Sequence, residues 1–300
     1  MNVLIFGGSG FLGTEINNLL NKNQFICHTA SFNNPKSDYK IDISNFDSFK
    51  DIPHNYYNVI INCATILPGK NFLDSDNLNN TFKTNILGTQ NICNWIKNQS
   101  KIKKIINCST LIVNRKPWKI SMTEKEETYN FGKHIVYANS KLFQELLFRT
   151  FCEKHYIKLT QIRFSALYGR EMPRSGLIWN LINEVKETNK ISLRNSKKIT
   201  IDYLNVIDAA KIVLNTLTKN KSFGIVNGAS GTEISIYDLA MIIKKYFKNS
   251  KLNNLEDEHY KSDRSKISTK KLQKIININE FISLENGIKE LICDYTRVLN

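Results

Sequence analysis

The sequence predicts an α/β fold in which helices cover both faces of a doubly wound parallel sheet. The first observation is Val3–Phe6, an apolar run without polar alternation, as expected of a central parallel strand. The second is a glycine pattern that follows at once, formed by Gly7, Gly10 and Gly13. The third is a helical apolar spacing, carried by Ile16, Leu19 and Leu20. Strand, glycine turn and helix in this order predict a dinucleotide-binding unit of the Rossmann type.

Each glycine of this turn has a distinct physical task. Gly7 permits the tight turn, and Gly10 has no Cβ, so the backbone can approach a pyrophosphate. Gly13 allows the helix to pack close to the strand, and the phosphate charge then lies at the helix N-terminus. An ordinary strand-to-helix turn is the alternative, but the flanking strand and helix favour a nucleotide site. The predicted cofactor-binding residues here are Gly7, Ser9, Gly10, Phe11, Leu12 and Gly13.

Composition bounds the class of protein. The chain has 300 residues, with 41% apolar and 23% charged residues, which is typical of a globular protein with a sizeable core. No apolar run is long enough to cross a membrane, and the first apolar run lacks the features of a signal peptide. Six cysteines without a C-x-x-C pair indicate reduced, structural thiols. We therefore expect a cytoplasmic protein, without a membrane partner and without a metal site.

The formal net charge is +15, from 42 Lys and Arg against 27 Asp and Glu. Such a charge is compatible with nucleic-acid binding. The basic residues are spread along a chain rich in Lys, Asn and Ile, however, so compositional bias is the favoured explanation. No nucleic-acid partner is expected, and an RNA-binding, non-enzymatic protein of this fold is kept as a remote alternative.

The second predicted strand, Phe25–Ala30, bears on the choice of cofactor. An acidic residue at the end of this strand binds the adenosine ribose of NAD. Here Ser31 follows the strand and no acid is present, which favours NADP and leaves NAD possible. Ser31, Asn33 and Lys36 are candidates to lie near a 2′-phosphate.

Two further segments are expected to contact the cofactor. Ile41–Ile43 resembles the end of a third strand, with Asp42 placed to meet the adenine amino group and Ile43 beside it. The alternative for Asp42 is the cap of the following helix. Val59–Ala64 is a buried strand, so Ala64 and Thr65 at its carboxyl end should face the cofactor.

Tyr137 and Lys141 lie four residues apart at the start of a predicted helix and so share a face. A phenol of pKa about 10 is a poor catalyst at neutral pH, but a neighbouring ammonium favours the phenolate. A strand that ends in Ser109-Thr110 comes just before this pair. The combination indicates an acid–base site rather than a solvated helix face.

These motifs together resemble the extended short-chain dehydrogenase/reductase family, the NAD(P)-dependent epimerases, dehydratases and reductases that act mostly on nucleotide sugars. The resemblance spans nearly the whole chain. It includes the glycine turn, the pair Tyr137 and Lys141, and further segments at Asn85–Asn91, Asn107–Thr110, Arg163–Gly169, Ile201–Asp208 and Asn227–Ser235.

The resemblance implies roles for individual residues. Tyr137 and Lys141 match the catalytic pair, which also contacts the cofactor, and Asn85 matches a mainly structural Asn near the cofactor. The catalytic hydroxyl falls on Ser109, with Thr110 as the alternative, and both are expected to contact substrate. Many members bind the substrate diphosphate with an Arg where this chain has Ile201, so the candidate replacements are Arg170, Arg174, Arg194 and Arg264.

The resemblance also implies an activity. The segment after Ser109-Thr110 lacks the Asp-Glu pair of the 4,6-dehydratases, which argues against dehydration. We expect a reductase of a nucleotide-linked 4-keto-6-deoxysugar that uses NADPH. The alternative is a nucleotide-sugar 4-epimerase with tightly bound NAD.

The expected organisation has two parts. A dinucleotide-binding domain takes residues 1–164 and 200–226, and a smaller substrate-binding lobe takes residues 165–199 and 227–300. A homodimer is implied through helices near Lys83–Asn98 and Tyr137–Glu153. Trp95 and Phe148 are candidate dimer anchors, although such residues more often belong to the core.

Overall fold

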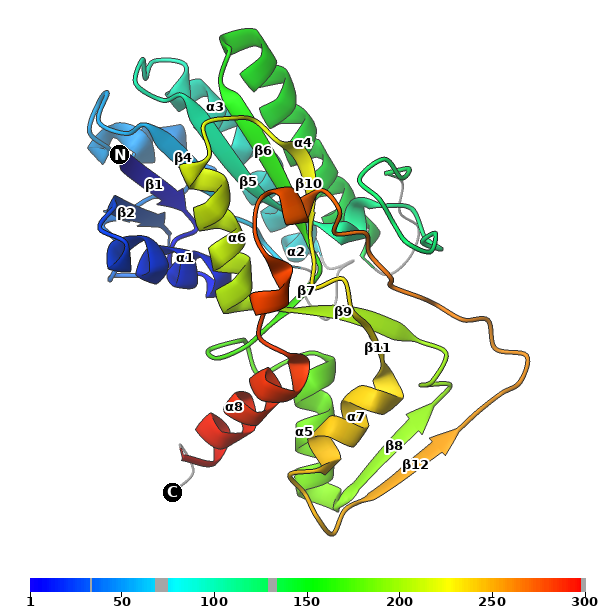
Figure 1. The fold of residues 1–300 in the computed structure, drawn as a ribbon. Helices are drawn as coiled ribbons and strands as arrows, with labels where there is room; N and C mark the ends of the chain where they lie inside the picture. Colours follow the sequence, from blue (N-terminus) through cyan, green and yellow to red (C-terminus); the bar gives the residue numbers. More distant parts are fainter. Residues whose placement is uncertain (33, 68–74, 129–133, 298–300) are drawn as a thin grey trace. The chain divides into compact units, whose positions relative to one another are not determined.

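Strands and helices alternate along the chain, and most of the strands form one large sheet, as the computed structural model shows (Figure 1). The structure describes residues 1–32, 34–67, 75–128 and 134–297. In the order of the large sheet, its strands are β10 (Gly224–Gly228), β6 (Lys158–Phe164), β5 (Lys104–Thr110), β4 (Val59–Asn62), β1 (Asn2–Phe6), β2 (Ile26–Ser31) and β3 (Tyr39–Lys40). The strand pairs from β3 to β6 are all parallel, which confirms the predicted fold class.

The order of the strands places the site. From β1 the chain first adds β2 and β3 on one side, and it then returns to add β4, β5 and β6 on the other. The connections therefore diverge between β1 and β4, and ligands of such sheets bind at the carboxyl ends of the two strands that flank this point. Gly7 follows β1, and Ala64 and Thr65 follow β4.

Helices pack on both faces of this sheet. One face carries α2 (Ser75–Thr81), the π-helical turn η2 (Phe82–Leu87), α3 (Gly88–Ile96) and α4 (Ile135–His155). Figure 1 shows α1 (Phe11–Lys22) and α6 (Val206–Thr218) over the other face. The connections also contain two short 3₁₀ turns, η1 (Phe46–Asp51) and η3 (Leu111–Val113).

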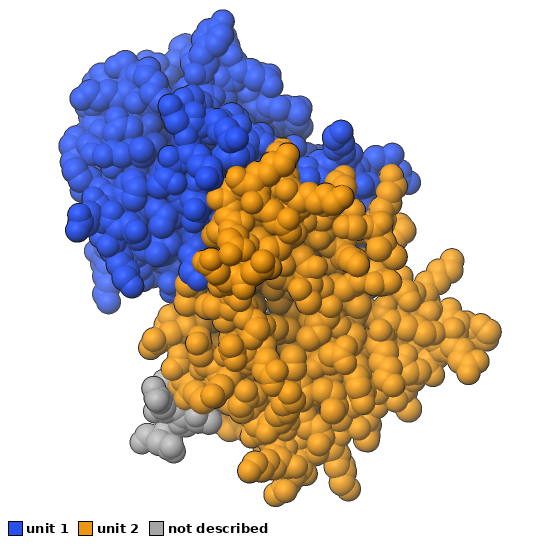
Figure 2. Space-filling view, in the orientation of Figure 1, with its two compact units in different colours: residues 1–116, 124–164, 209–227 blue, residues 117–123, 165–208, 228–300 orange. Residues whose placement is uncertain are grey.

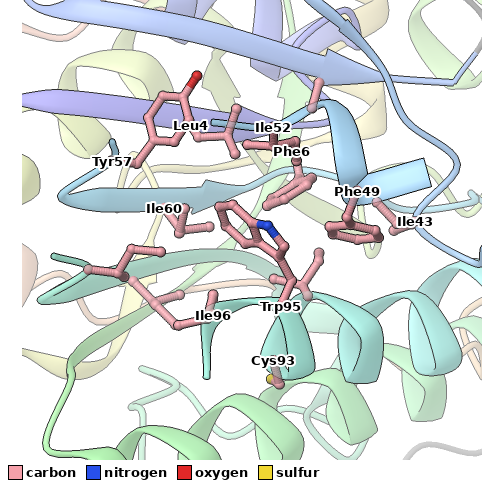
Figure 3. Close-up of a cluster of buried hydrophobic side chains, with 14 of the residues drawn as sticks. Leu4, Phe6, Ile43, Phe49, Ile52, Tyr57, Ile60, Cys93, Trp95 and Ile96 are labelled. Atoms are coloured by element: carbon pink, nitrogen blue, oxygen red, sulfur yellow. The ribbon is translucent and has the colours of Figure 1, made fainter. Parts of the chain in front are cut away.

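The core between the sheet and α3 and α4 is apolar and aromatic. Leu4, Phe6 and Ile60 project from the strands into this core (Figure 3). The ring of Trp95 meets that of Phe6 edge-on, with 6.1 Å between centroids. Trp95 is 7% exposed and Phe148 is 0% exposed, so both are core residues and neither is available as a dimer anchor.

The third strand is shorter than the sequence indicates, which corrects the expectation for Ile41–Ile43. β3 ends at Lys40, and residues 41–43 are outside any strand. The reason is local, because the carboxylate of Asp42 accepts from the N–H of Ser44 at 2.9 Å and turns the chain. The second strand begins at Ile26 and ends at Ser31, one residue later at each end than expected.

The chain divides into two compact units (Figure 2). The first comprises residues 1–116, 124–164 and 209–227, and the second comprises residues 117–123, 165–208 and 228–300. Residues 200–208, expected in the larger domain, group with the second unit, because β9 (Thr200–Asn205) pairs with β7 (Ala166–Tyr168) and β11 (Glu233–Ser235).

The second unit has its own core. Its other elements are α5 (Leu177–Thr188), β8 (Lys190–Arg194), α7 (Ile236–Lys244), β12 (Lys251–Leu255), η4 (Leu272–Lys274), η5 (Ile278–Glu280) and α8 (Leu284–Arg297). β8 and β12 form a parallel pair. The helices α5, α7 and α8 bury Trp179, Ile182, Leu239 and Ile288 together. Across the described ranges, no helix has the length and apolar character needed to cross a membrane.

A buried lysine holds the C-terminus of α6. The ammonium of Lys104 at the start of β5 donates to the carbonyl oxygens of Thr216 and Lys219 at 2.5 and 2.7 Å. Lys104 is only 6% exposed. Its charge therefore satisfies carbonyl groups that the helix itself leaves without partners.

We expect Lys104→Met to lower the free energy of unfolding by about 1–3 kcal/mol, because buried carbonyl groups lose their donor. Urea unfolding measures this change, and the exposed Lys101→Met is the matched control. Equal stability of the two variants would show that Lys104 does not cap α6.

Candidate active site

The glycine turn after β1 has the geometry that a dinucleotide requires. Gly7 has a φ of +75°, and a Cβ there would lie 2.6 Å from the backbone N of Ala64. A Cβ on Gly13 would lie 2.2 Å from the carbonyl oxygen of Gly7. Both positions therefore exclude any side chain, and α1 begins close against the end of β1.

The N-terminus of α1 is suited to a pyrophosphate. Gly10 is its N-cap and offers no side-chain cap, and its first turn contains no acidic residue. The first N–H groups of a helix have no partner within it, and they favour an anion. Ser9, Phe11 and Leu12 are half-buried around this turn. The residues present thus fit the phosphates of NAD or NADP.

At the end of β2, Ser31 binds the glycine turn. Its Oγ accepts from the backbone N–H of Ser9 at 3.1 Å, and Ser31 is 7% exposed. The structure brings two charged residues near this point that sequence reasoning missed. Asp38 accepts from the N–H of Thr29 at 2.7 Å, and Lys40 pairs in register with Ser31 on β3. Of the earlier candidates, Lys36 is exposed and Asn33 lies outside the described residues.

Asp42 and Ile43 have structural contacts. The carboxylate of Asp42 caps a turn by accepting from the N–H and hydroxyl of Ser44, at 2.9 and 2.7 Å. Ile43 is 6% exposed, and a Cβ on Gly88 would lie 2.6 Å from its side chain. The cap of the following helical turn η1 is Asn45, whose side chain accepts from the N–H of Asp47, so Asp42 closes a local turn and is not that cap. The second carboxylate oxygen of Asp42 makes neither of the bonds to Ser44.

Tyr137 lies in the first turn of α4, beside the carboxyl end of β4. Its side chain lies near the hydroxyl of Thr65. Burial raises the pKa of Tyr137 to about 12, opposed in part by the hydroxyl of Thr65, so the lowering expected from the neighbouring Lys141 ammonium is not seen. The phenol is consequently protonated at neutral pH.

Lys141 lies one helical turn further along α4 and is 1% exposed. Its ammonium donates to the carbonyl oxygen of Cys108 at 2.8 Å and to Oε1 of Gln144 at 2.5 Å. Burial lowers the pKa of Lys141 to about 8. Nearby, the sulfur atoms of Cys63 and Cys108 are 3.5 Å apart as free thiols.

Asn85 connects the segment after β4 to α4. Its Oδ1 accepts from the N–H of Ile66 at 2.8 Å and from the hydroxyl of Thr65 at 3.2 Å. Its Nδ2 donates to Oγ of Ser140 at 2.9 Å. Asn85 is fully buried in the π-helical turn η2, a kind of irregularity that is frequent at functional sites.

Ser109 takes part in a buried ionic network. It donates its hydroxyl proton to Oε1 of Glu145 over 2.6 Å. Arg163 of β6 donates from Nη2 to the same carboxylate at 2.7 Å, and these charged side chains are 2% and 3% exposed. An ionised carboxylate can only accept. The single proton of Ser109 is therefore committed to Glu145.

Thr110 differs from Ser109 in this respect. It is the last residue of β5 and half-buried, and its Oγ1 accepts from the N–H of Ile112 at 3.3 Å. This bond leaves the hydroxyl proton of Thr110 available to another acceptor.

Sequence reasoning missed Glu145 and Gln144, although a signal for Glu145 was present. Tyr137, Lys141 and Glu145 follow at intervals of four residues, which places them along one face of α4.

All four candidate arginines lie in the second unit. The guanidinium of Arg174 lies over the ring of Trp179, 5.8 Å from its centroid, and the other three differ in their ion pairs. Arg170 is 3.1 Å from the carboxylate of Asp294, and Arg264 pairs with Glu233. Arg194 is exposed at the end of β8 and makes no ion pair with any described residue. Arg194 is thus the one of these three whose charge is not neutralised by a carboxylate.

Comparisons with known proteins identify the relatives of this chain. A model of the NAD dependent epimerase/dehydratase family matches residues 3–228. A candidate UDP-glucose 4-epimerase of Methanocaldococcus jannaschii is 26% identical over 81% of this chain and 81% of its own. A trifunctional UDP-glucose 4,6-dehydratase, 3,5-epimerase and UDP-4-keto-L-rhamnose reductase of Arabidopsis thaliana is 22% identical over 99% of this chain, which spans 47% of that relative.

Solved structures share the fold. UDP-glucose 4-epimerase of Thermus thermophilus with NAD superposes with a TM-score of 0.78 at 18% identity, over 99% of both chains. UDP-glucuronic acid 4-epimerase of Bacillus cereus, with UDP-glucuronic acid and NAD, gives 0.81 at 20% identity over the full length of both. The family match over three quarters of the sequence confirms the resemblance drawn from the glycine turn and from the pair Tyr137 and Lys141. The chain belongs to the NAD dependent epimerase/dehydratase family, and it is an enzyme of the extended short-chain dehydrogenase/reductase type.

Proposed function

We propose that the protein is a reductase of a nucleotide-linked 4-keto-6-deoxysugar. The observation that carries this proposal is the buried pair Tyr137 and Lys141, which lie one turn apart on α4, with Lys141 bonded to the backbone of β5. When bound, a nicotinamide dinucleotide supplies hydride chemistry. The part of Tyr137 is to donate its proton to the carbonyl oxygen of the substrate, and Lys141 orients the cofactor ribose.

The hydroxyl that supports the carbonyl oxygen is assigned to Thr110. A donor is needed where negative charge develops on that oxygen. Ser109, the residue favoured from the sequence, donates its hydroxyl proton in a hydrogen bond to Glu145, whereas the hydroxyl proton of Thr110 is available to substrate.

Dehydration lacks the groups it needs. Leu111 and Ile112 follow Thr110, so no carboxylate stands at either position. Glu145 is the carboxylate bonded to Ser109, and Arg163 holds it in a buried ion pair. Its two oxygens bind Arg163 and Ser109, which leaves elimination of water without an evident acid and base.

NADP is the proposed cofactor. A carboxylate beside the adenosine ribose would repel a 2′-phosphate, and Ser31 ends β2 in its place. Lys40, adjacent to Ser31 in register, is exposed and has no ion-pair partner within the described ranges. An ammonium and a hydroxyl at this position favour a phosphate group, and the nearby carboxylate of Asp38 is bound to the N–H and hydroxyl of Thr29.

A 4-epimerase with tightly held NAD is the second candidate. It would use the same residues to oxidise and re-reduce one carbon, and the names of the M. jannaschii relative and of the solved structures favour it. One experiment separates the two functions. The protein is mixed with NADPH or NADH and a nucleotide-linked 4-keto-6-deoxyhexose, and the absorbance of reduced nicotinamide is followed. Stoichiometric loss with NADPH supports the reductase. No loss, together with nicotinamide that co-purifies and interconversion of UDP-hexoses, supports the epimerase.

We expect Tyr137→Phe to lower turnover by about 10²–10⁴-fold, because the proton donor is lost. Binding of NADPH, measured by fluorescence titration, should be retained, since the ring is kept. Turnover equal to that of the unchanged protein would refute the assignment of Tyr137.

Thr110→Val should lower turnover by about 10²–10³-fold with little change in stability. Ser109→Ala should instead lower the free energy of unfolding by about 1–3 kcal/mol, because Glu145 loses a donor, and change turnover less. Steady-state kinetics and urea unfolding of both variants test this contrast. A larger loss of turnover in Ser109→Ala would return the catalytic role to Ser109.

A homodimer is proposed through η2 and α4. The exposed apolar side chains of these elements are Phe82, Leu87, Phe143 and Leu146, from 38% to 53% exposed. Sedimentation should show a dimer, and Phe143→Lys should shift it toward monomer because a charge would be buried at the interface. Tyr156→Lys, at the exposed C-cap of α4, is the control. An unchanged dimer in Phe143→Lys would place the interface elsewhere.

A further inference from the structure

Gln144 is a fully buried residue of α4 to which neither the family motif nor the proposed reaction gives a role. It lies three residues after Lys141. Its Oε1 accepts from the Lys141 ammonium at 2.5 Å, and its Nε2 donates to Oγ1 of Thr89 at 2.9 Å. A polar side chain at this depth needs partners for its hydrogen-bonding groups, and these two partners join Lys141 to α3.

The direction of each bond in this chain is fixed. The backbone carbonyl of Asn85 can only accept, and Thr89 donates its hydroxyl proton to it at 2.8 Å. Thr89 must then accept from Gln144, which can donate only from its NH₂ group. The amide of Gln144 therefore has one orientation, in which its oxygen faces Lys141.

Among the described residues, this arrangement leaves Lys141 one free donor. An ammonium has three N–H groups, and Cys108 and Gln144 take two of them. Both acceptors are neutral, so they hold the charge without neutralising it. The remaining N–H is the one available to a hydroxyl group of a bound ribose.

The charge on Lys141 is sensitive to its acceptors. Burial lowers its pKa to about 8, while Cys108, Cys63 and Glu145 oppose this fall. Tyr137 is the other titratable group of α4 one turn away, and it is protonated in this range. Because the pKa lies near neutral pH, loss of one acceptor would lower the fraction of Lys141 that is charged at neutral pH.

We propose that Gln144 is a positioning residue, which aims the third N–H of Lys141 at the cofactor ribose and keeps Lys141 protonated. The proposal rests on the proposed function through the role of Lys141 as a ribose ligand. It does not depend on the sugar that the enzyme reduces.

The test is the pH dependence of NADPH binding, measured by fluorescence titration from pH 6 to 10 on the full chain. The dissociation constant of the unchanged protein should rise as pH passes the pKa of Lys141. In Gln144→Met the charged form loses an acceptor, so this rise should move to lower pH by about one unit. In Gln144→Glu the acceptor becomes a carboxylate, so the rise should move to higher pH.

Opposite shifts in these two variants would support the proposal, because a merely structural role would weaken binding without moving the pH at which it falls. Shifts of the same sign, or none, would overturn it. Thr89→Val is a second variant, since it frees the amide of Gln144 to turn and should shift the rise in the same direction as Gln144→Met. The exposed Gln90→Met on α3 is the matched control and should shift nothing.

This test of Gln144 and the test of the proposed function can fail independently of each other. A protein that binds NADPH with these shifts but reduces no 4-keto sugar would refute the reductase and retain the role of Gln144. A protein that reduces the sugar with no shift in either variant would retain the reductase and refute the role of Gln144.

Discussion

The buried ion pair between Glu145 and Arg163 is the interaction that fixes α4 on the sheet. Its two charges are 2.7 Å apart and almost without exposure to solvent. Removing such charges from water is costly, so the pair contributes little to net stability but strongly disfavours any arrangement that separates it. A turn of α4 about its axis would leave both charges unpaired. The ion pair therefore sets which face of α4 meets β5, and with it the positions of Tyr137 and Lys141.

A layer of paired amide side chains crosses the carboxyl half of β4, β5 and β6. Toward the amino ends of the strands, Leu4, Ile60 and Ile105 pack under α3 and α4. Toward the carboxyl ends, amide side chains replace these apolar residues on β4, β5 and β6. Asn62 donates to Asn107 at 3.0 Å, and Asn107 donates to Gln161 at 3.2 Å. Buried amides are tolerated when they are paired, and a paired layer favours one register over its neighbours.

The helical segment beside β4 shows how the site uses irregular structure. Between α2 and α3 the chain adopts the π-helical turn η2, which contains Asn85. From there one side chain bonds the backbone of Ile66, the hydroxyl of Thr65 and Ser140 of α4. Its carbonyl oxygen accepts the bond that orients Thr89 and, through it, Gln144. The segment after β4 and the chain of bonds that reaches Lys141 thus both begin in one irregular turn.

The sequence alone determined the features that depend on neighbours in the chain. The strand before Gly7, the glycine turn and the start of α1 are local, because φ, close backbone approach and helix spacing follow from consecutive residues. The shared face of Tyr137 and Lys141 is local for the same reason.

Only the tertiary structure decided which hydroxyl is free, because the partner of Ser109 lies 36 residues away and the ion-pair partner of Glu145 lies 18 away. It likewise placed Lys40 beside Ser31, paired Arg170 and Arg264 with carboxylates, and buried Trp95 and Phe148 in the core. A proton donor can serve a substrate only if no other acceptor holds its proton, and those acceptors come from segments that the fold alone brings together.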